Sequence, residues 1–167
     1  MTHAAPEVQL YLLRHAHAGD PMAWEGPDER RPLSAKGERQ AERLARFLKR
    51  IEFSPDVILS SPKLRSVQTA TPVATSLGLK VRVDERLSDA PGLDELEAML
   101  ADAGGPRRPV LVGHDPGFSS LVALICGAPS IPMRKGAMAR IDASRPVQPG
   151  GGTLRWLIPP DLLEGGA

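Results

Sequence analysis

The sequence predicts an α/β fold in which helices cover both faces of a mostly parallel central sheet, giving three layers. Strand-like and helix-like segments alternate along the chain, and three of the strand-like segments are apolar throughout, as buried parallel strands are. A Pro/Gly-rich turn near the end separates two further strand-like segments. With 167 residues the chain suits one domain with a substantial core, so we expect a single domain over residues 1–167.

The chain opens with a predicted strand from Val8 to His15, which is too continuously apolar to face water on one side. Residues 19–32, rich in proline and glycine, form the longest predicted loop. We expect this loop at the mouth of a ligand pocket, because loops that follow such strands bind ligands. A helix from Ser34 to about Arg50 comes next, since apolar residues recur there at helical spacing and Ser34 suits the N-cap.

The middle of the chain continues the alternation. Residues 57–60 form a second apolar strand, and Pro62 is predicted to occupy the first turn of the helix that follows. This helix is expected to bend near Pro72, which lacks an N–H group, and to stop at Gly78. It is the second of the predicted covering helices.

The second half of the chain holds the remaining elements. A short strand and a short helix precede the third apolar strand, and another helix follows it. Their expected ranges are 81–83, 94–100, 110–113 and 117–126. The last two strands, 136–142 and 153–158, are predicted to form a C-terminal hairpin at the sheet edge.

Composition narrows the possible functions. Hydrophobic residues make up 41% of the chain, and a formal net charge of +1 provides no broad positive field, so we expect no nucleic-acid partner. No stretch approaches the roughly 20 apolar residues of a membrane-spanning helix, so no membrane partner is expected. Residues 1–7 lack a signal-peptide pattern, which makes the cytoplasm the expected compartment. The oligomeric state has no signal in the sequence.

The single cysteine, Cys126, lies in an apolar segment and is expected to pack rather than to react.

Two of the apolar strands end in a histidine. Arg14 and His15 stand where the first strand should meet solvent, and His114 follows the third. Arg65 lies in the helix after the second strand, so its guanidinium can turn toward the same sheet edge. A neutral imidazole is a nucleophile for phosphorus, and guanidinium groups bind phosphoryl oxygens. We therefore predict one pocket for phosphate chemistry. In it His15 is the nucleophile, His114 stabilises charge on the oxygens, and the two arginines bind the phosphoryl group.

His17 lies two residues after His15, which raises the question of a metal site, since alternate residues of an extended chain share a face. A pocket that already holds two arginines repels a divalent cation, and no cysteine or carboxylate stands at convincing ligand spacing. We therefore expect no metal, and we place His17 at the pocket rim as a substrate-binding residue.

Four motifs, in this order along the chain, resemble those of the histidine phosphatase superfamily, which has the phosphoglycerate-mutase-like fold. They are Arg14-His15-Ala16-His17-Ala18, Arg31-Pro32-Leu33-Ser34-Ala35-Lys36-Gly37, Ser60-Ser61-Pro62 with Arg65 and Gln68-Thr69-Ala70, and Gly113-His114-Asp115-Pro116-Gly117. The short SixA-like branch of phosphohistidine phosphatases fits best. The resemblance implies phosphorylation of His15, a phosphate pocket lined by Arg14, Arg65 and His114, and no metal or organic cofactor.

The chain departs from this family at the general acid. Many members use a glutamate between the positions of Arg65 and His114, within a local motif that this chain lacks. Asp89 and Asp28 remain as candidate proton donors. A leaving imidazole of pKa about 6.5 can be protonated without a dedicated acid, so a phosphoramidate such as phosphohistidine is a chemically suitable substrate.

These observations predict a metal-independent phosphohydrolase that forms a covalent phosphohistidine on His15 and removes phosphate from phosphohistidine on a partner protein. Two alternatives stay open. One is a phosphomonoesterase of the same superfamily that cleaves a small phosphate ester with a loop carboxylate as its acid. The other is a non-catalytic module that binds phosphate. A mutase is disfavoured, because the chain is short and lacks the mutase-type acid.

Overall fold

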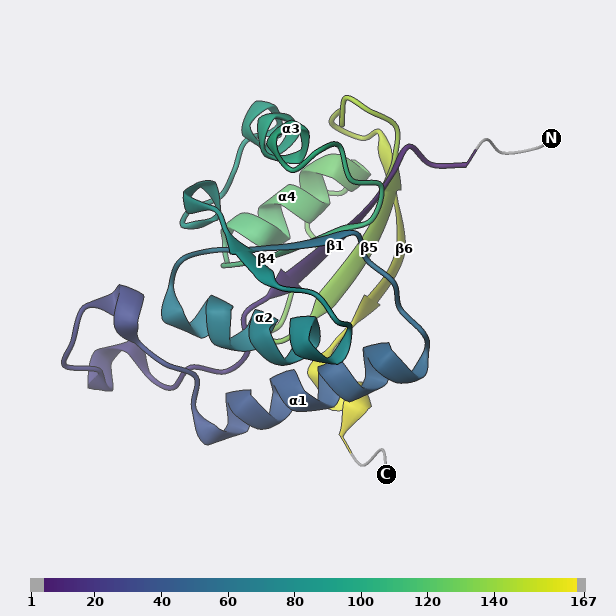
Figure 1. The fold of residues 1–167 in the computed structure, drawn as a ribbon. Coiled ribbons are helices and arrows are strands. Elements are labelled where there is room, and N and C mark those ends of the chain that lie inside the picture. The colour runs from purple at the N-terminus through teal and green to yellow at the C-terminus, as the bar shows by residue number, and fades with distance from the viewer. Residues whose placement is uncertain (1–4, 165–167) are drawn as a thin grey trace.

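The computed structural model describes residues 5–164, in which one six-stranded sheet lies between two pairs of helices (Figure 1). The strands are β1 (Val8–Arg14), β2 (Val57–Ser60), β3 (Val81–Val83), β4 (Pro109–Gly113), β5 (Met138–Ala143) and β6 (Gly152–Ile158). The helices are α1 (Ala35–Arg50), α2 (Leu64–Ser76), α3 (Leu93–Asp102) and α4 (Gly117–Cys126). The predicted three-layer α/β/α architecture is confirmed.

The strand order in the sheet is β3-β2-β4-β1-β5-β6. The first four of these strands are parallel to one another, and β5 and β6 add an antiparallel hairpin at one edge, as predicted. β1 and β4 are neighbours in the middle of the sheet, with Arg14 opposite Gly113. Because parallel strands end at the same edge, the residues that follow β1 and β4 emerge side by side.

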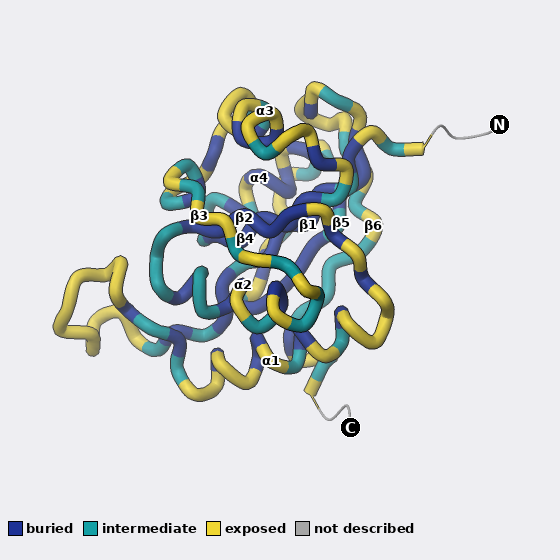
Figure 2. The backbone as a smooth tube through the Cα atoms, viewed as in Figure 1, coloured by how far each residue is buried: buried dark blue, intermediate teal, exposed yellow. Residues whose placement is uncertain are grey.

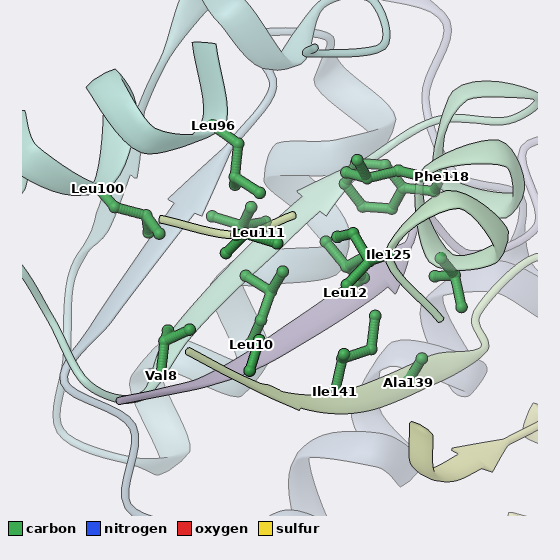
Figure 3. Close-up of a cluster of buried hydrophobic side chains, with 14 of the residues drawn as sticks. Val8, Leu10, Leu12, Leu96, Leu100, Leu111, Phe118, Ile125, Ala139 and Ile141 are labelled. Atoms are coloured by element: carbon green, nitrogen blue, oxygen red, sulfur yellow. The ribbon is translucent and has the colours of Figure 1, made fainter. Parts of the chain in front are cut away.

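The two faces of the sheet carry separate apolar cores, since successive residues of β1 point in opposite directions. Leu10 and Leu12 pack with α3 and α4, in the cluster drawn in Figure 3. Tyr11 and Leu13 pack on the other face, with α1 and α2. Figure 2 shows the central strands β1, β2 and β4 as mostly buried, and the edge strands β3 and β6 as partly exposed. Cys126, at the end of α4, is half-buried against the first of these cores.

One local expectation, the start of α2, differs from the structure. Pro62 precedes α2 instead of lying in its first turn: the Lys63 N–H donates to Ser61 Oγ at 3.2 Å, and the helix begins only at Leu64. The loop over residues 19–32 contains two short 3₁₀ turns, Pro21–Ala23 and Asp28–Arg30. It projects from the body of the molecule, and nearly all of it is exposed (Figure 2).

The helix α1 begins as the sequence predicts, with the Ser34 hydroxyl accepting the Gly37 N–H at 3.1 Å. α2 continues through Pro72 to Ser76, and Gly78 follows with a φ of 72°. None of the helices within residues 5–164 has the length and apolar character needed to span a membrane.

Candidate active site

A cavity of about 610 Å³ opens where β1 and β4 end and α2 begins. Its lining residues are Arg14, His15, Pro21, Arg31, Lys63, Arg65, Ser88, Asp89, Ala90, His114, Asp115, Pro116, Gly117, Ser120 and Lys135. The four residues predicted to form the phosphate pocket all reach this one cavity. The pairing of β1 with β4 brings the two histidines together, and their ring centroids lie 5.2 Å apart.

His15 is the first residue after β1 and is only 6% exposed. Its Nδ1 lies 2.7 Å from the carbonyl oxygen of Ala16. Since a carbonyl only accepts hydrogen bonds, Nδ1 carries the proton and Nε2 carries the free electron pair. Burial, together with the charge of Arg65 and the other two cavity arginines, lowers the pKa of His15 to about 4. The imidazole is therefore neutral near pH 7, which is the form that can attack phosphorus.

His114 follows β4, and its hydrogen-bond partners contact Nε2, whereas the partner of His15 contacts Nδ1. Its Nε2 lies 2.7 Å from Ser61 Oγ and 3.3 Å from Ser66 Oγ. Because Ser61 Oγ already accepts the Lys63 N–H, its own hydroxyl proton is available to donate to Nε2. With Ser61 as the donor, the proton of the neutral ring is on Nδ1; with Ser61 as the acceptor, it is on Nε2. Burial, followed by the charge of His15 and nearby cations, lowers the pKa of His114 to about 3.

Each arginine of the predicted pocket has its own hydrogen-bond partners, and Arg65 is buried whereas Arg14 is half-buried. Nη1 of Arg14 donates to the Met133 carbonyl at 2.7 Å and lies 3.3 Å from the Asp115 carboxylate. The two terminal nitrogens of Arg65 both donate to Asp28, Nη1 to its carbonyl at 2.8 Å and Nη2 to its carboxylate at 2.9 Å. In each guanidinium the Nε–H group has no partner among the described residues and can donate a hydrogen bond to a ligand.

Within residues 5–164, four buried side-chain nitrogens have no hydrogen-bond partner. They are Arg14 Nε, Arg65 Nε, His114 Nδ1 and Arg108 Nε. Three of the four belong to residues that line the cavity. Buried polar groups are hydrogen-bonded in the great majority of cases, so a concentration of three unsatisfied nitrogens around one cavity marks a site suited to an acceptor ligand.

Asp28 bridges two of the cavity arginines. Its Oδ2 accepts from Arg65, and its Oδ1 accepts the Nε–H of Arg31 at 3.1 Å. Burial alone would raise the pKa of Asp28, but the hydrogen bonds and charges of these two arginines outweigh it and hold that pKa below its usual range. A carboxyl group that stays ionised is a poor proton donor. The structure therefore argues against Asp28 as a general acid.

Of the other two candidate site residues, Asp89 lines the cavity and His17 does not. Asp89 lines the cavity, from the segment between β3 and α3. His17 does not line it: the His17 N–H donates to Gln40 at 2.9 Å, and the ring Nδ1 lies 2.6 Å from Ser34 Oγ. β1 ends at Arg14, so the alternation of an extended strand does not continue as far as His17. Within the described chain, no three His, Cys, Asp or Glu side chains group as a metal site requires.

Three further cations line the cavity that the sequence did not assign to it: Arg31, Lys63 and Lys135. Arg31 stood within a family motif but received no role, although it is 7% exposed and donates to the Ala18 carbonyl at 2.7 Å. Its burial depends on the path of the loop before α1, which has no periodic pattern. Lys135 lies just before β5, and only the long-range pairing of β5 with β1 brings it near the histidines.

Comparison with known proteins supports the same assignment. The model of the histidine phosphatase superfamily (branch 1) matches residues 10–102. Phosphohistidine phosphatase SixA of Escherichia coli (strain K12) is 27% identical over 162 residues, which cover 94% of this chain and 97% of SixA. A solved structure of the protein histidine phosphatase SixA with tungstate superimposes with a TM-score of 0.79 at 26% identity, over 94% of this chain and all of the other.

A more distant neighbour shares the fold alone. The alpha-ribazole phosphatase of Shigella flexneri has a TM-score of 0.69 at 20% identity, over 90% of this chain and 96% of its own. The family match extends over more than half of the chain and includes His15 and Arg65. Together with the SixA similarity over nearly the whole length, it shows that the chain belongs to the histidine phosphatase superfamily.

Proposed function

We propose that this chain is a single-domain, metal-independent phosphohydrolase that transfers the phosphoryl group of phosphohistidine, carried by a partner protein, to His15 and then to water. One observation carries the proposal: around a single cavity, a neutral imidazole with a free Nε2 stands beside three unsatisfied nitrogens. Nε2 of His15 is the nucleophile. Arg14 Nε, Arg65 Nε and Nδ1 of His114 are the donors for the phosphoryl oxygens.

In the first step, Nε2 of His15 forms a bond to phosphorus while the phosphorus–nitrogen bond of the substrate breaks. The substrate imidazole leaves as a neutral ring when its other nitrogen already carries a proton, which a group of pKa about 6.5 readily acquires. The proton of His15 stays on Nδ1, hydrogen-bonded to the Ala16 carbonyl, and its positive charge balances the negative charge of the bound phosphoryl group. The three donor groups bind the oxygens as negative charge shifts onto them.

In the second step, water attacks phosphorus and the bond to Nε2 breaks. The hydroxyl group of water goes to phosphate, its other proton is released to solvent, and His15 returns to its neutral form with the proton still on Nδ1. The enzyme needs no metal in either step, because three nitrogen donors and the surrounding arginine charges supply the stabilisation of the transferred group.

Two considerations support phosphohistidine on a protein as the substrate. SixA, a phosphohistidine phosphatase by name, is similar over nearly the whole chain. In addition, Asp28 is held ionised by two arginines, which makes it a poor acid for expelling an alkoxide. A phosphoramidate does not need such an acid.

A small phosphate ester is the second candidate substrate, and Asp89 is the residue that favours it. Asp89 lines the cavity, as a general acid for an alkoxide leaving group must. Under this alternative, Asp89→Asn lowers kcat for the ester by about 100-fold and leaves phosphohistidine turnover almost unchanged.

The proposal is tested by assaying phosphate release from a phosphohistidine protein and from a panel of sugar and nucleotide phosphates, all with chelator present. We expect the phosphohistidine protein to be cleaved fastest, and rapid quenching to trap acid-labile phosphate on His15. Faster cleavage of an ester reverses the substrate assignment. Saturable phosphate binding without turnover of any substrate identifies a binding module instead of an enzyme.

A further inference from the structure

Two lysines stand on opposite sides of the paired histidines. Lys63 lies between β2 and α2, and Lys135 lies just before β5, and both line the cavity. In the sheet, β2 is the outer neighbour of β4 and β5 is the outer neighbour of β1. The cavity is therefore bounded by one lysine next to the His114 strand and by another next to the His15 strand.

These lysines differ from the cavity arginines in their partners. Arg14 is paired with Asp115, and Asp28 is shared by Arg31 and Arg65. Neither Lys63 nor Lys135 forms a salt bridge with any carboxylate of residues 5–164. Both are half-buried, so their ammonium groups have lost part of their hydration. No ion pair with another described residue compensates for this loss.

The space around the lysines exceeds what a phosphoryl group fills. Cavities of about 300–1,000 Å³ hold whole small molecules, and this one measures about 610 Å³. The Nε groups of Arg14 and Arg65 and Nδ1 of His114 account for the phosphoryl oxygens in the proposed mechanism. The two lysine ammonium groups are therefore free to bind the parts of the substrate that lie next to the phosphoryl group.

We propose that Lys63 and Lys135 bind further anionic groups of the substrate, so that the enzyme prefers phosphorylated compounds that carry a carboxylate or a second phosphate beside the phosphoryl group. On a protein substrate these anions are acidic side chains that flank the phosphohistidine. On a small molecule they belong to the same compound. This inference rests on the proposed function, since it names the class of substrate that the same cavity selects.

Other charged groups act on the lysines and on any anion that they bind. Burial, with the charges of Arg14 and Arg31, lowers the pKa of Lys135, while Asp20 opposes that effect, so a bound anion relieves a cost already present in the free protein. Asp89 is the cavity carboxylate that no arginine or lysine pairs with, and it disfavours a second anion on its own wall. Asp89→Asn therefore increases the preference for doubly anionic substrates.

The first experiment compares two phosphohistidine peptides that differ only in having Glu or Gln on both sides of the phosphohistidine. We expect kcat/KM to be about tenfold higher for the Glu peptide at low salt, the effect of one charge-assisted contact, and the ratio to shrink as salt is added. A parallel small-molecule pair, free phosphohistidine and its methyl ester, shows whether a carboxylate on the same compound has the same effect. Equal rates within both pairs overturn the proposal.

Substitution of the lysines tests whether they cause the preference for the Glu peptide. Lys63→Met and Lys135→Met are each expected to reduce the Glu-to-Gln ratio about threefold, and the double variant to bring it close to one. Lys49→Met is the matched control: Lys49 is exposed in the last turn of α1 and does not line the cavity, so its removal leaves both the activity and the ratio unchanged. A ratio that survives in the double variant, with an unchanged unfolding midpoint, contradicts the assignment to these lysines.

A binding measurement separates this inference from the catalytic proposal. In a His15→Ala background, calorimetry compares inorganic phosphate with pyrophosphate, and we expect pyrophosphate to bind about tenfold more tightly unless both lysines are replaced. If this preference is present while the wild-type enzyme releases no phosphate from any substrate, the catalytic proposal fails and the anion site stands. If the wild type turns over phosphohistidine but shows no preference in binding or rate, only the anion site fails.

Discussion

His15 and His114 end neighbouring parallel strands, yet the protein holds them by opposite ring nitrogens. Nδ1 of His15 bonds to a backbone carbonyl, whereas Nε2 of His114 bonds to the hydroxyl of Ser61. The first arrangement leaves Nε2 of His15 unprotonated, and in the proposed tautomer of His114 the second leaves Nδ1 protonated. The two histidines follow similar apolar strands, but their different hydrogen-bond partners suit them to different roles.

This difference explains how two neutral imidazoles serve one reaction. A nucleophile needs an electron pair, and a group that stabilises phosphoryl oxygens needs a proton to donate. Burial and surrounding positive charge depress the pKa of both rings, so the tautomer and not the charge separates their proposed roles. The predictions below test whether the two histidines are as different in function as they are in contacts.

The largest effect is expected for His15→Ala. Without the nucleophile no covalent intermediate forms, and we expect phosphate release to fall by at least about 10⁴-fold. Phosphate release and acid-labile labelling of the protein measure the two consequences. Circular dichroism checks that the variant is folded. Turnover at a near-normal rate by this variant refutes the assignment of the nucleophile.

His114→Gln is expected to be less severe, with a loss of about 10²–10³-fold in kcat. An amide still offers an N–H group, but not in the position or with the polarity of the imidazole. Because Nε2 of His15 is untouched, labelled phosphate should still accumulate on His15, only more slowly. If His114→Gln abolishes labelling while His15→Ala retains it, the roles of the two histidines are exchanged.

The depressed pKa of His15 predicts a change in stability with pH. The folded state holds this pKa at about 4, below the ordinary value of 6.5, so between these values the unfolded chain binds more protons. The free energy of unfolding should therefore fall as pH is lowered from about 6.5 to 4, by about 3 kcal/mol for this group. Urea unfolding at several pH values should show a shallower decline for His15→Ala. Identical slopes for the wild type and this variant would falsify the assigned shift.

The smallest effect is expected for Ser61→Ala, which removes the hydroxyl at 2.7 Å from Nε2 of His114. Without it the other tautomer becomes accessible, and kcat should fall by about tenfold with little change in KM. Ser66→Ala, which removes the weaker contact at 3.3 Å, is the matched control and should cost less. A larger loss in Ser66→Ala than in Ser61→Ala contradicts the proposed tautomer of His114.

The sequence predicted what depends on local pattern. Apolar strands that end in His15 and His114 were recognisable, and so was their position in the middle of the sheet, because continuous apolar runs occur where both faces are covered. Arg65 was predicted correctly to reach the cavity, since a helix that starts beside a strand end keeps its first turn near that edge.

What the sequence did not predict depends on contacts between distant segments. The burial of Arg31 follows from an irregular loop that folds back on Asp28 and Ala18. Lys135 reaches the cavity through the pairing of β5 with β1. His17 was misplaced for the same kind of reason: its N–H donates to Gln40, and its ring lies against the hydroxyl of Ser34. No periodicity records such long-range hydrogen bonds.

The position of β4 between β1 and β2 has a consequence for how the protein is made. β1 and β2 are parallel strands that never touch, since the sheet places β4 between them. A nascent chain that has emerged from the ribosome only as far as Gly105 already contains the future nucleophile, but it has no strand with which to join the two halves of the sheet. Insertion of β4 completes the parallel part of the sheet and delivers the second histidine in the same event. The pairing of the two histidines is thus acquired only after more than half of the chain has been made.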